Sequence, residues 1–210
     1  MEVLVGSSLS LLLLGAMQDF FGAQQRALLV QSAYTDSQNV TRTFTDLIGR
    51  ELRQASYDPI APGAGGAIAA TADVNWCPGT DQGITIATSS SIRFIADLNG
   101  DGDTTDASEN IYYYLAGNAI FRQDANGTPI TLVTGVPTVG LSLRYYNNSN
   151  PPVELVPASV ALTTGQRDCV AKVLITVQSS LPNPDPHRTD PLISTAQTEI
   201  AIRSRSLNNI

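Results

Sequence analysis

Residues 3–17 read VLVGSSLSLLLLGAM, an apolar run with no charged side chain. This run is shorter than the roughly 20 residues that a membrane-spanning helix needs, and it lacks the basic flank and A-x-A cleavage site of a secretory signal peptide. The chain does not break after it, because residues 19–57 contain no proline and only the glycines Gly22 and Gly49. We therefore predict one helix over residues 3–57, about 80 Å long at 1.5 Å per residue.

The second half of this predicted helix is amphipathic. One stripe at helical spacing, interrupted by a single acid, consists of Val40, Phe44, Leu47, Ile48, Glu51 and Ala55. The charged residues that lie largely off the stripe are Arg42, Asp46, Arg50 and Arg53. Asp58-Pro59 is expected to end the helix, because proline disfavours the α conformation of the residue before it. A head of this size cannot cover so long a rod, so the apolar half must contact lipid or other subunits.

Glu2 heads the apolar half, and its charge has two interpretations. It is either an ordinary acid at a helix N-terminus, which the macrodipole favours by roughly 0.3–1 kcal/mol, or an acid in hydrocarbon that needs a positive partner. In a helical bundle, that partner can be the N-terminal amine of a neighbouring subunit.

Residues 58–210 are predicted to form a β-rich head after a flexible connection at residues 63–67, GAGGA. The expected strands are residues 84–87, 92–96, 111–115, 119–122, 139–146, 170–177 and 198–202, with a tight turn at Gly117-Asn118. Strands that follow one another without helices between them favour an antiparallel sheet packed on the amphipathic half of the helix. The predicted fold class is therefore α+β, with an assembly helix at residues 1–57 and a globular head at 58–210. A generic β-sandwich is the alternative for the head.

The head contains an acidic, glycine-rich loop with the pattern D-x-N-x-D-G. Oxygen-bearing side chains at alternate positions can wrap around one calcium ion, which takes six to eight oxygen ligands. The candidate ligands are Asp97, Asn99, Asp101 and Asp103, with Asp106 or Glu109 closing the site. The loop is not an EF-hand, because the twelfth position is Ser108 and the loop follows a strand. The alternative is a solvated turn, although four carboxylates between Asp97 and Asp106 repel one another unless a cation lies among them.

Two cysteines, Cys77 and Cys169, lie far apart, with no CxxC pair or nearby histidine to indicate zinc. The predicted pairing is one disulfide between them, which would stabilise the fold by roughly 3–5 kcal/mol in the chain-entropy model. Two separate buried thiols are the alternative.

Composition and motifs exclude several functions. Charged residues make up 15% of the 210 residues, the net charge is -7, and Lys172 is the sole lysine, which argues against nucleic acid or anionic lipid as a partner. The single histidine, His187, lies in a proline-rich segment that is expected to be an exposed loop. With no GxSxG, HExxH, GxGxxG or P-loop motif, we predict that the protein is not an enzyme. A cluster of tyrosines could form a sugar platform but is expected to straddle a sheet: Tyr112, Tyr113, Tyr114, Tyr145 and Tyr146.

Two stretches of the sequence resemble a known family. Residues 2–6, EVLVG, and 8–12, SLSLL, resemble the N-terminal helix of type IV prepilins, in which a glutamate precedes V-L-V or L-L-V. Residues 91–103, SIRFIADLNGDGD, and 111–115, IYYYL, resemble the head of PilW-type minor pilins, with a strand, an acidic loop and an aromatic strand in that order. Family members carry a basic leader and Gly-Phe-Thr-Leu-Ile or similar ahead of the glutamate, whereas here Met1 directly precedes Glu2.

The resemblance implies a type IV pilin-like fold and a structural role. The helix would lie in the inner membrane, with the head in the periplasm, and would then pack against other pilin subunits in the extracellular pilus, where Glu2 pairs with a subunit's N-terminal amine. As a minor pilin near the tip, the protein would help to initiate assembly and present its head for adhesion or for a tip adhesin. The alternatives are a minor pseudopilin of a type II secretion system and a membrane-anchored calcium-binding adhesive module. An in-frame basic leader in the DNA upstream of Met1 would favour both filament hypotheses over the anchor.

Overall fold

A single long helix dominates the computed structural model, which describes residues 2–55, 83–99, 101, 106–125, 127–155 and 161–202. Helix α1 runs over Glu2–Arg53, and the amides of Gln54 and Ala55 then bond carbonyls three residues back, which tightens its last turn. The α-helix thus ends four residues before the predicted Tyr57. The predicted connection at residues 63–67 lies outside the described residues.

The first sheet is a five-stranded antiparallel meander in the order β1-β2-β3-β4-β5. Its strands are β1 Ile84–Ala87, β2 Ser91–Ile95, β3 Asn110–Ala116, β4 Ala119–Asp124 and β5 Ile130–Thr134. A short 3-10 helix, η1 (Ala107–Glu109), precedes β3. The predicted tight turn joins β3 to β4, and Gly117 adopts the positive φ of +61° that a two-residue hairpin turn requires.

The second sheet has four antiparallel strands in the order β7-β6-β8-β9. Its strands are β6 Leu141–Tyr146, β7 Glu154–Leu155, β8 Lys172–Leu181 and β9 Leu192–Ala201. Along β8 buried and half-buried side chains alternate, as the two-residue period of a strand dictates. Helix α2 (Thr164–Asp168) precedes β8 and begins with a capping box between Thr163 and Gln166.

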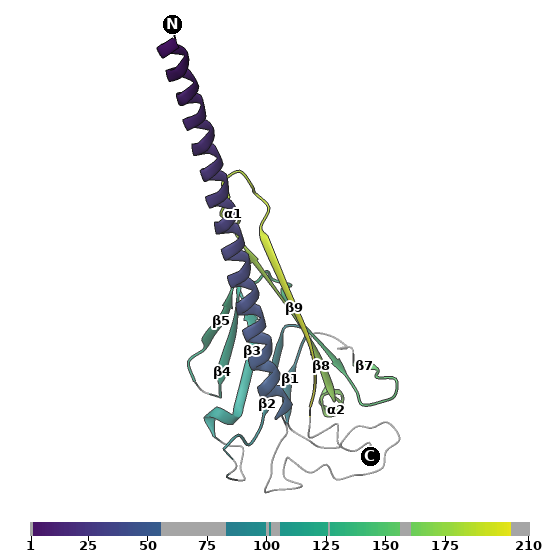
Figure 1. Ribbon diagram of the computed structural model, residues 1–210. Coiled ribbons are helices and arrows are strands. Elements are labelled where there is room, and N and C mark those ends of the chain that lie inside the picture. The colour runs from purple at the N-terminus through teal and green to yellow at the C-terminus, as the bar shows by residue number, and fades with distance from the viewer. Residues whose placement is uncertain are drawn as a thin grey trace.

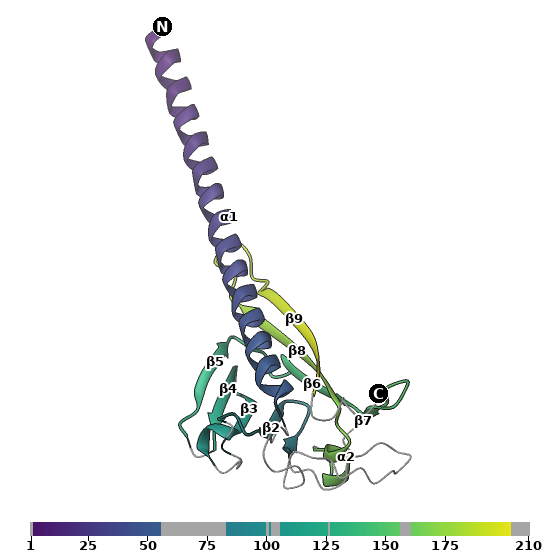
Figure 2. The same cartoon turned by 60° about the horizontal axis from the view of Figure 1, so that its bottom comes forward.

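The C-terminal third of α1 and both sheets enclose one hydrophobic core. Figures 1 and 2 show α1 lying against the head, with β3, β4 and β5 on one side and β8 and β9 on the other. Phe44, Ile48 and Leu52 of the helix belong to this core together with residues of both sheets. Gly49 allows the close approach of β9, because a Cβ at that position would lie 3.4 Å from Cδ1 of Ile200.

The α+β fold class and the antiparallel arrangement are confirmed, with three differences of detail. The head contains two sheets rather than one, and sequence reasoning missed β5, β7 and α2. Strand β9 also begins at Leu192, six residues before the predicted start. The missed elements carry weak signals: β5 has one buried residue, β7 has two residues and α2 has five.

One member of the predicted helix stripe is wrong: Val40 is 42% exposed. The buried face at this level instead carries Ser37, Thr41 and Thr45. The hydroxyl of Thr41 donates to the helix carbonyl of Ser37, and that of Thr45 donates to the carbonyl of Arg42, so both can be buried without stranding a donor. A stripe defined by apolar residues could not find this face. The charged residues predicted to lie off the stripe are all exposed, as expected.

Candidate functional site

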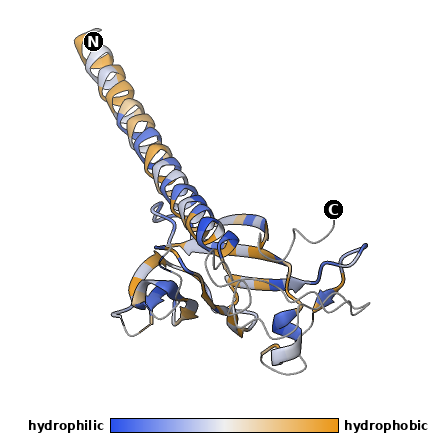
Figure 3. Cartoon of the chain, turned by 90° about the horizontal axis from the view of Figure 1, so that it is seen from below, coloured by the Kyte–Doolittle hydropathy of each residue, from blue (hydrophilic) through white to orange (hydrophobic). Residues whose placement is uncertain are grey.

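The N-terminal two thirds of α1 projects from the head without covering. None of residues 3–36, all of which the structure describes, is buried. We call these residues the projecting segment, which is about 50 Å long at 1.5 Å per residue. Its exposed large apolar side chains are Val3, Leu4, Val5, Leu9, Leu11, Leu12, Leu13, Leu14, Met17, Phe20, Phe21, Leu28 and Leu29. In Figure 3 the hydrophobic colour of the helix is concentrated toward its N-terminal end. A contiguous apolar surface of this size marks contact with lipid or protein.

The projecting segment is long and apolar enough to cross a membrane. An 18-residue window has a mean hydropathy of 1.5 and at most two charged residues, and none of it is buried. The charge-free run at residues 3–17 is too short by itself, as the sequence indicated. The helix nevertheless continues without a break past Asp19 to Phe20 and Phe21, which extends the apolar surface. Consequently α1 has the features of a membrane anchor.

Three serines of the projecting segment form hydrogen bonds to carbonyls of their own helix. The hydroxyls of Ser7 and Ser8 donate to the carbonyls three residues back, at 3.0 and 2.9 Å, and that of Ser10 donates to the carbonyl of Gly6 at 2.9 Å. A hydroxyl that is satisfied by its own helix costs little in an apolar environment. These serines are therefore compatible with burial in lipid or between helices.

The glycines of the projecting segment have no visible packing role within the chain. A Cβ at Gly6, Gly15 or Gly22 would meet no described atom within 4 Å. Glycine in a helix interior costs roughly 0.5–1 kcal/mol relative to alanine. These three glycines therefore destabilise the isolated helix, and no contact with the described part of the head offsets that cost. Small residues allow close helix–helix approach, which is where such glycines have a use.

Glu2 is the first residue of α1, at the end of the helix far from the head. Its side chain lies outside what the structure describes. The pairing of this acid with a positive partner therefore stays a prediction.

A groove beside α1 forms a separate, mainly apolar patch where the helix meets the head. It is lined by Asn39, Val40, Thr43, Phe44, Leu47 and Leu132. The exposed Val40 belongs to this groove rather than to the core. The helix thus presents exposed apolar side chains over residues 3–29 and again at Val40 beside β5, with a mostly polar stretch at residues 31–39 between them.

An ionic cluster fixes the head to α1. Glu51 Oε2 accepts hydrogen bonds from the Tyr113 hydroxyl of β3 at 2.5 Å and from Arg122 Nε of β4 at 3.2 Å, while Arg122 Nη2 lies 3.2 Å from Glu51 Oε1. Arg122 also pairs with Asp124 at 2.5 Å. Burial, together with the charge of Glu51 and its hydrogen bond, raises the pKa of Tyr113 well above its ordinary value, so the phenol remains a donor. Glu51, the one acid in the predicted stripe, therefore links α1 to strands β3 and β4 of the head.

The structure separates the predicted calcium ligands into two groups. The carboxylates of Asp97, Asp101 and Glu109 each offer one oxygen, and these oxygens lie within 4.8 Å of one another. Asp106 instead accepts a hydrogen bond from the Asn99 amide at 2.9 Å, and the same amide donates to Asp101. The predicted ligand Asp103 lies outside the described residues.

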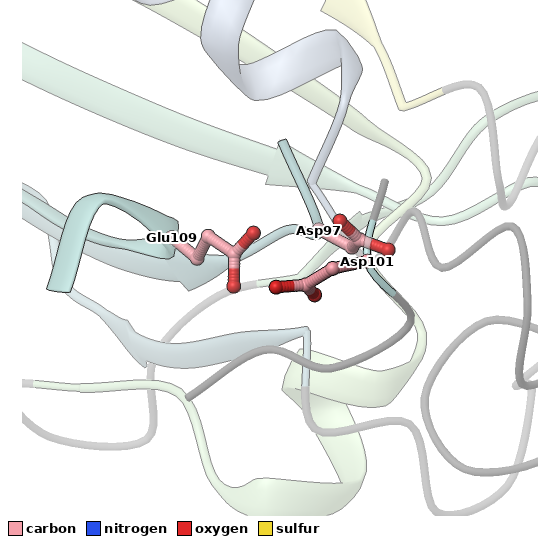
Figure 4. Close-up of side chains that lie close together, drawn as sticks. All are labelled: Asp97, Asp101 and Glu109. Carbon is pink, nitrogen blue, oxygen red and sulfur yellow. The ribbon is translucent and has the colours of Figure 1, made fainter. Parts of the chain in front are cut away.

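Glu109 is the deepest of these carboxylates. It is fully buried, and its Oε1 accepts hydrogen bonds from the amides of Leu98 and Asn99 at 3.1 and 3.4 Å. Its Oε2 has no hydrogen-bond partner among the described residues. Figure 4 shows this carboxylate directed toward Asp97 and Asp101.

The remaining predicted features have mixed outcomes. Cys169 is buried at the end of α2, but Cys77 lies outside the described residues, so the disulfide stays a prediction. His187 is exposed between β8 and β9, as expected. The tyrosines of β3 straddle the sheet as predicted: Tyr113 is buried, and Tyr112 and Tyr114 are half-buried and stack at 4.6 Å between ring centroids.

No protein-family model matches this sequence, and no curated protein matches it. A long apolar N-terminal helix that leads into an antiparallel β head is compatible with a pilin-like fold.

Proposed function

We propose that this protein is a structural subunit of a type IV pilus, a minor pilin that assembles through the projecting segment. The observation that carries the proposal is the absence of any buried residue across positions 3–36 of a continuous helix with an apolar surface. In water such a surface is unfavourable by about 25 cal/mol per Å². Lipid before assembly and sister helices after assembly would each remove it from water.

Two further features favour helices, rather than lipid alone, as the final environment. The glycines Gly6, Gly15 and Gly22 weaken the helix but would let another backbone approach closely. The groove between α1 and β5 adds a second apolar patch on the same helix, beyond the length that a bilayer core of roughly 30 Å covers. A neighbouring subunit's helix can contact both the projecting segment and this groove, whereas a bilayer can cover only the projecting segment.

In this proposal Glu2 sets the register between α1 and the helices of neighbouring subunits. An unpaired carboxylate in an apolar bundle is costly, so the helix would settle where Glu2 meets a neighbour's N-terminal amine. The head would lie outside the bundle, fixed to α1 by the Glu51 cluster. Its exposed surface would be available for adhesion or for docking a tip protein, and the protein would have no catalytic role.

The test is deletion of the gene, followed by electron microscopy of surface fibres and complementation. We expect fewer or shorter fibres on deletion, and rescue by the wild type and by Asp19→Asn. We expect no rescue by Glu2→Gln. Both substitutions remove one negative charge from α1, but only Glu2→Gln removes the carboxylate that would pair with a neighbour's N-terminal amine. Unchanged fibres after deletion would contradict an assembly role in a pilus. Normal fibres with defective protein secretion would identify the pseudopilin alternative instead.

A further inference from the structure

We infer that the β2–η1 loop holds a calcium ion, bound by the carboxylates of Asp97, Asp101 and Glu109. This inference goes beyond filament assembly and does not depend on it. It rests on two observations about these side chains, namely the spacing of their oxygens and the unsatisfied oxygen of Glu109.

The spacing matches a single calcium ion. Calcium–oxygen distances are about 2.3–2.6 Å, so two ligands on opposite sides of one ion are separated by roughly 4.6–5.2 Å. The three carboxylate oxygens lie within 4.8 Å of one another, so a point no more than about 2.8 Å from all three exists, close to the calcium–oxygen distance. Calcium takes six to eight oxygens, so water and second carboxylate oxygens would complete the sphere.

The second observation is the unsatisfied oxygen of Glu109. Among the described residues none donates a hydrogen bond to this buried oxygen, and a buried carboxylate oxygen without a partner is costly. Oε1 of Glu109 accepts hydrogen bonds from the backbone amides of Leu98 and Asn99, and Figure 4 shows the carboxylate as a whole directed toward the two aspartates. A cation among the three carboxylates would satisfy Oε2 and would also offset their mutual repulsion.

The geometry also decides which residue closes the site. The sequence left Asp106 and Glu109 open as alternatives, and Glu109 is the one whose oxygen joins Asp97 and Asp101. Asp106 holds the Asn99 amide in place, and Asn99 Oδ1 accepts the backbone amide of Asp101, so this pair braces the loop. Asp97 follows β2 and Glu109 precedes β3, so the ion would fasten together the open end of the hairpin that carries Tyr113.

Calcium is favoured over magnesium by the character of the ligands. Magnesium demands octahedral geometry at about 2.0–2.1 Å and keeps several of its waters. Three carboxylates, two of them buried, leave less room for the waters that magnesium keeps. We therefore expect calcium to bind at least tenfold more tightly than magnesium.

The experiment uses the full chain in a non-ionic detergent after removal of divalent ions, titrated with calcium chloride in a calorimeter. We expect one site with a Kd between about 1 µM and 1 mM. We also expect Tm to rise by several degrees at about 100 times Kd. No saturable heat together with no change in Tm would overturn the inference, as would an equal effect of magnesium chloride.

Three variants assign the ligands. Asp101→Asn alters an exposed carboxylate of the cluster and should weaken calcium binding at least tenfold while leaving the metal-free Tm nearly unchanged. Glu109→Gln can still accept the two backbone amides through its remaining oxygen, yet it should weaken binding to the same extent. Asp106→Asn is the matched control, which removes the same charge from the same loop and should change Kd by less than about threefold. If Asp106→Asn weakened binding as much as Asp101→Asn, the proposed ligand set would be wrong.

Discussion

The contact between α1 and the head is most directly perturbed by Glu51→Ala. This change removes the acceptor of the Tyr113 hydroxyl and the main ionic partner of Arg122, at a site where Glu51 and Arg122 are 16% and 17% exposed. A buried hydroxyl that loses its acceptor costs roughly 1–3 kcal/mol. Removing one partner of a fully buried ion pair costs about 3–5 kcal/mol, but Asp124 still contacts Arg122, and the remaining exposure screens the charge. We therefore expect the free energy of unfolding to fall by about 2–4 kcal/mol.

The assay is urea unfolding of the full chain in detergent, followed by circular dichroism of the β head. Glu51→Gln should lose less, because its amide oxygen can still accept from Tyr113 while the charge opposite Arg122 is gone. Glu154→Ala is the matched control, since Glu154 pairs with Arg144 on the surface of the other sheet, where solvent screens the pair. Equal losses for Glu51→Ala and Glu154→Ala would refute the idea that the cluster fastens the head to the helix.

Three other outcomes are expected from the same structure. Gly49→Val should lower the free energy of unfolding by roughly 1–3 kcal/mol, because its side chain would press on Ile200, whereas Gly15→Ala should not destabilise the monomer; equal effects in urea unfolding would contradict this. Burial raises the pKa of both Tyr113 and Tyr145 above the ordinary value, so their neutral forms stabilise the folded state and this contribution is lost as pH rises past about 10. Ultraviolet titration should show two tyrosines that ionise only at higher pH or on unfolding, and Tyr145→Phe should remove one of them; ionisation of every tyrosine together near pH 10 would exclude the buried environments. Mass spectrometry without reduction should find a peptide linking Cys77 to Cys169, and reduction should cost roughly 3–5 kcal/mol; two alkylatable thiols in the native protein would rule the disulfide out.

The sequence is informative about the helix because its signals are local. The helix is predicted from properties of neighbouring residues: an uninterrupted run without proline, charged residues on one face and an apolar N-terminal half. The observed extent of α1, Glu2–Arg53, agrees closely with this prediction. The buried face near Thr41 could not be predicted in this way, because small hydroxyl residues satisfied by their own helix carry no apolar signal. The end at Arg53 rather than Tyr57 likewise depends on the last turn tightening before the proline is reached.

The candidate sites show the same division between local and long-range information. The acidic loop was recognisable from its spacing, but the separate roles of Asp106 and Glu109 depend on how η1 places them against β2. Glu51 looked like an interruption of an apolar stripe, since its partners Tyr113 and Arg122 lie more than sixty residues away in sequence. Pairing over such a distance is a property of the folded chain.

Packing of the projecting segment among the helices of other subunits can be tested directly by site-specific photo-crosslinking. A photoreactive residue at Leu11, which is 71% exposed in the isolated chain, would be activated in cells and in sheared surface fibres, with a matched probe at Val139 on the head, which is 79% exposed. We expect the Leu11 probe to form adducts with other filament subunits in the fibres, and the Val139 probe not to crosslink to their N-terminal helices. Recovery of Leu11 adducts with lipid alone, and no trace of the chain in the fibres, would contradict this expectation.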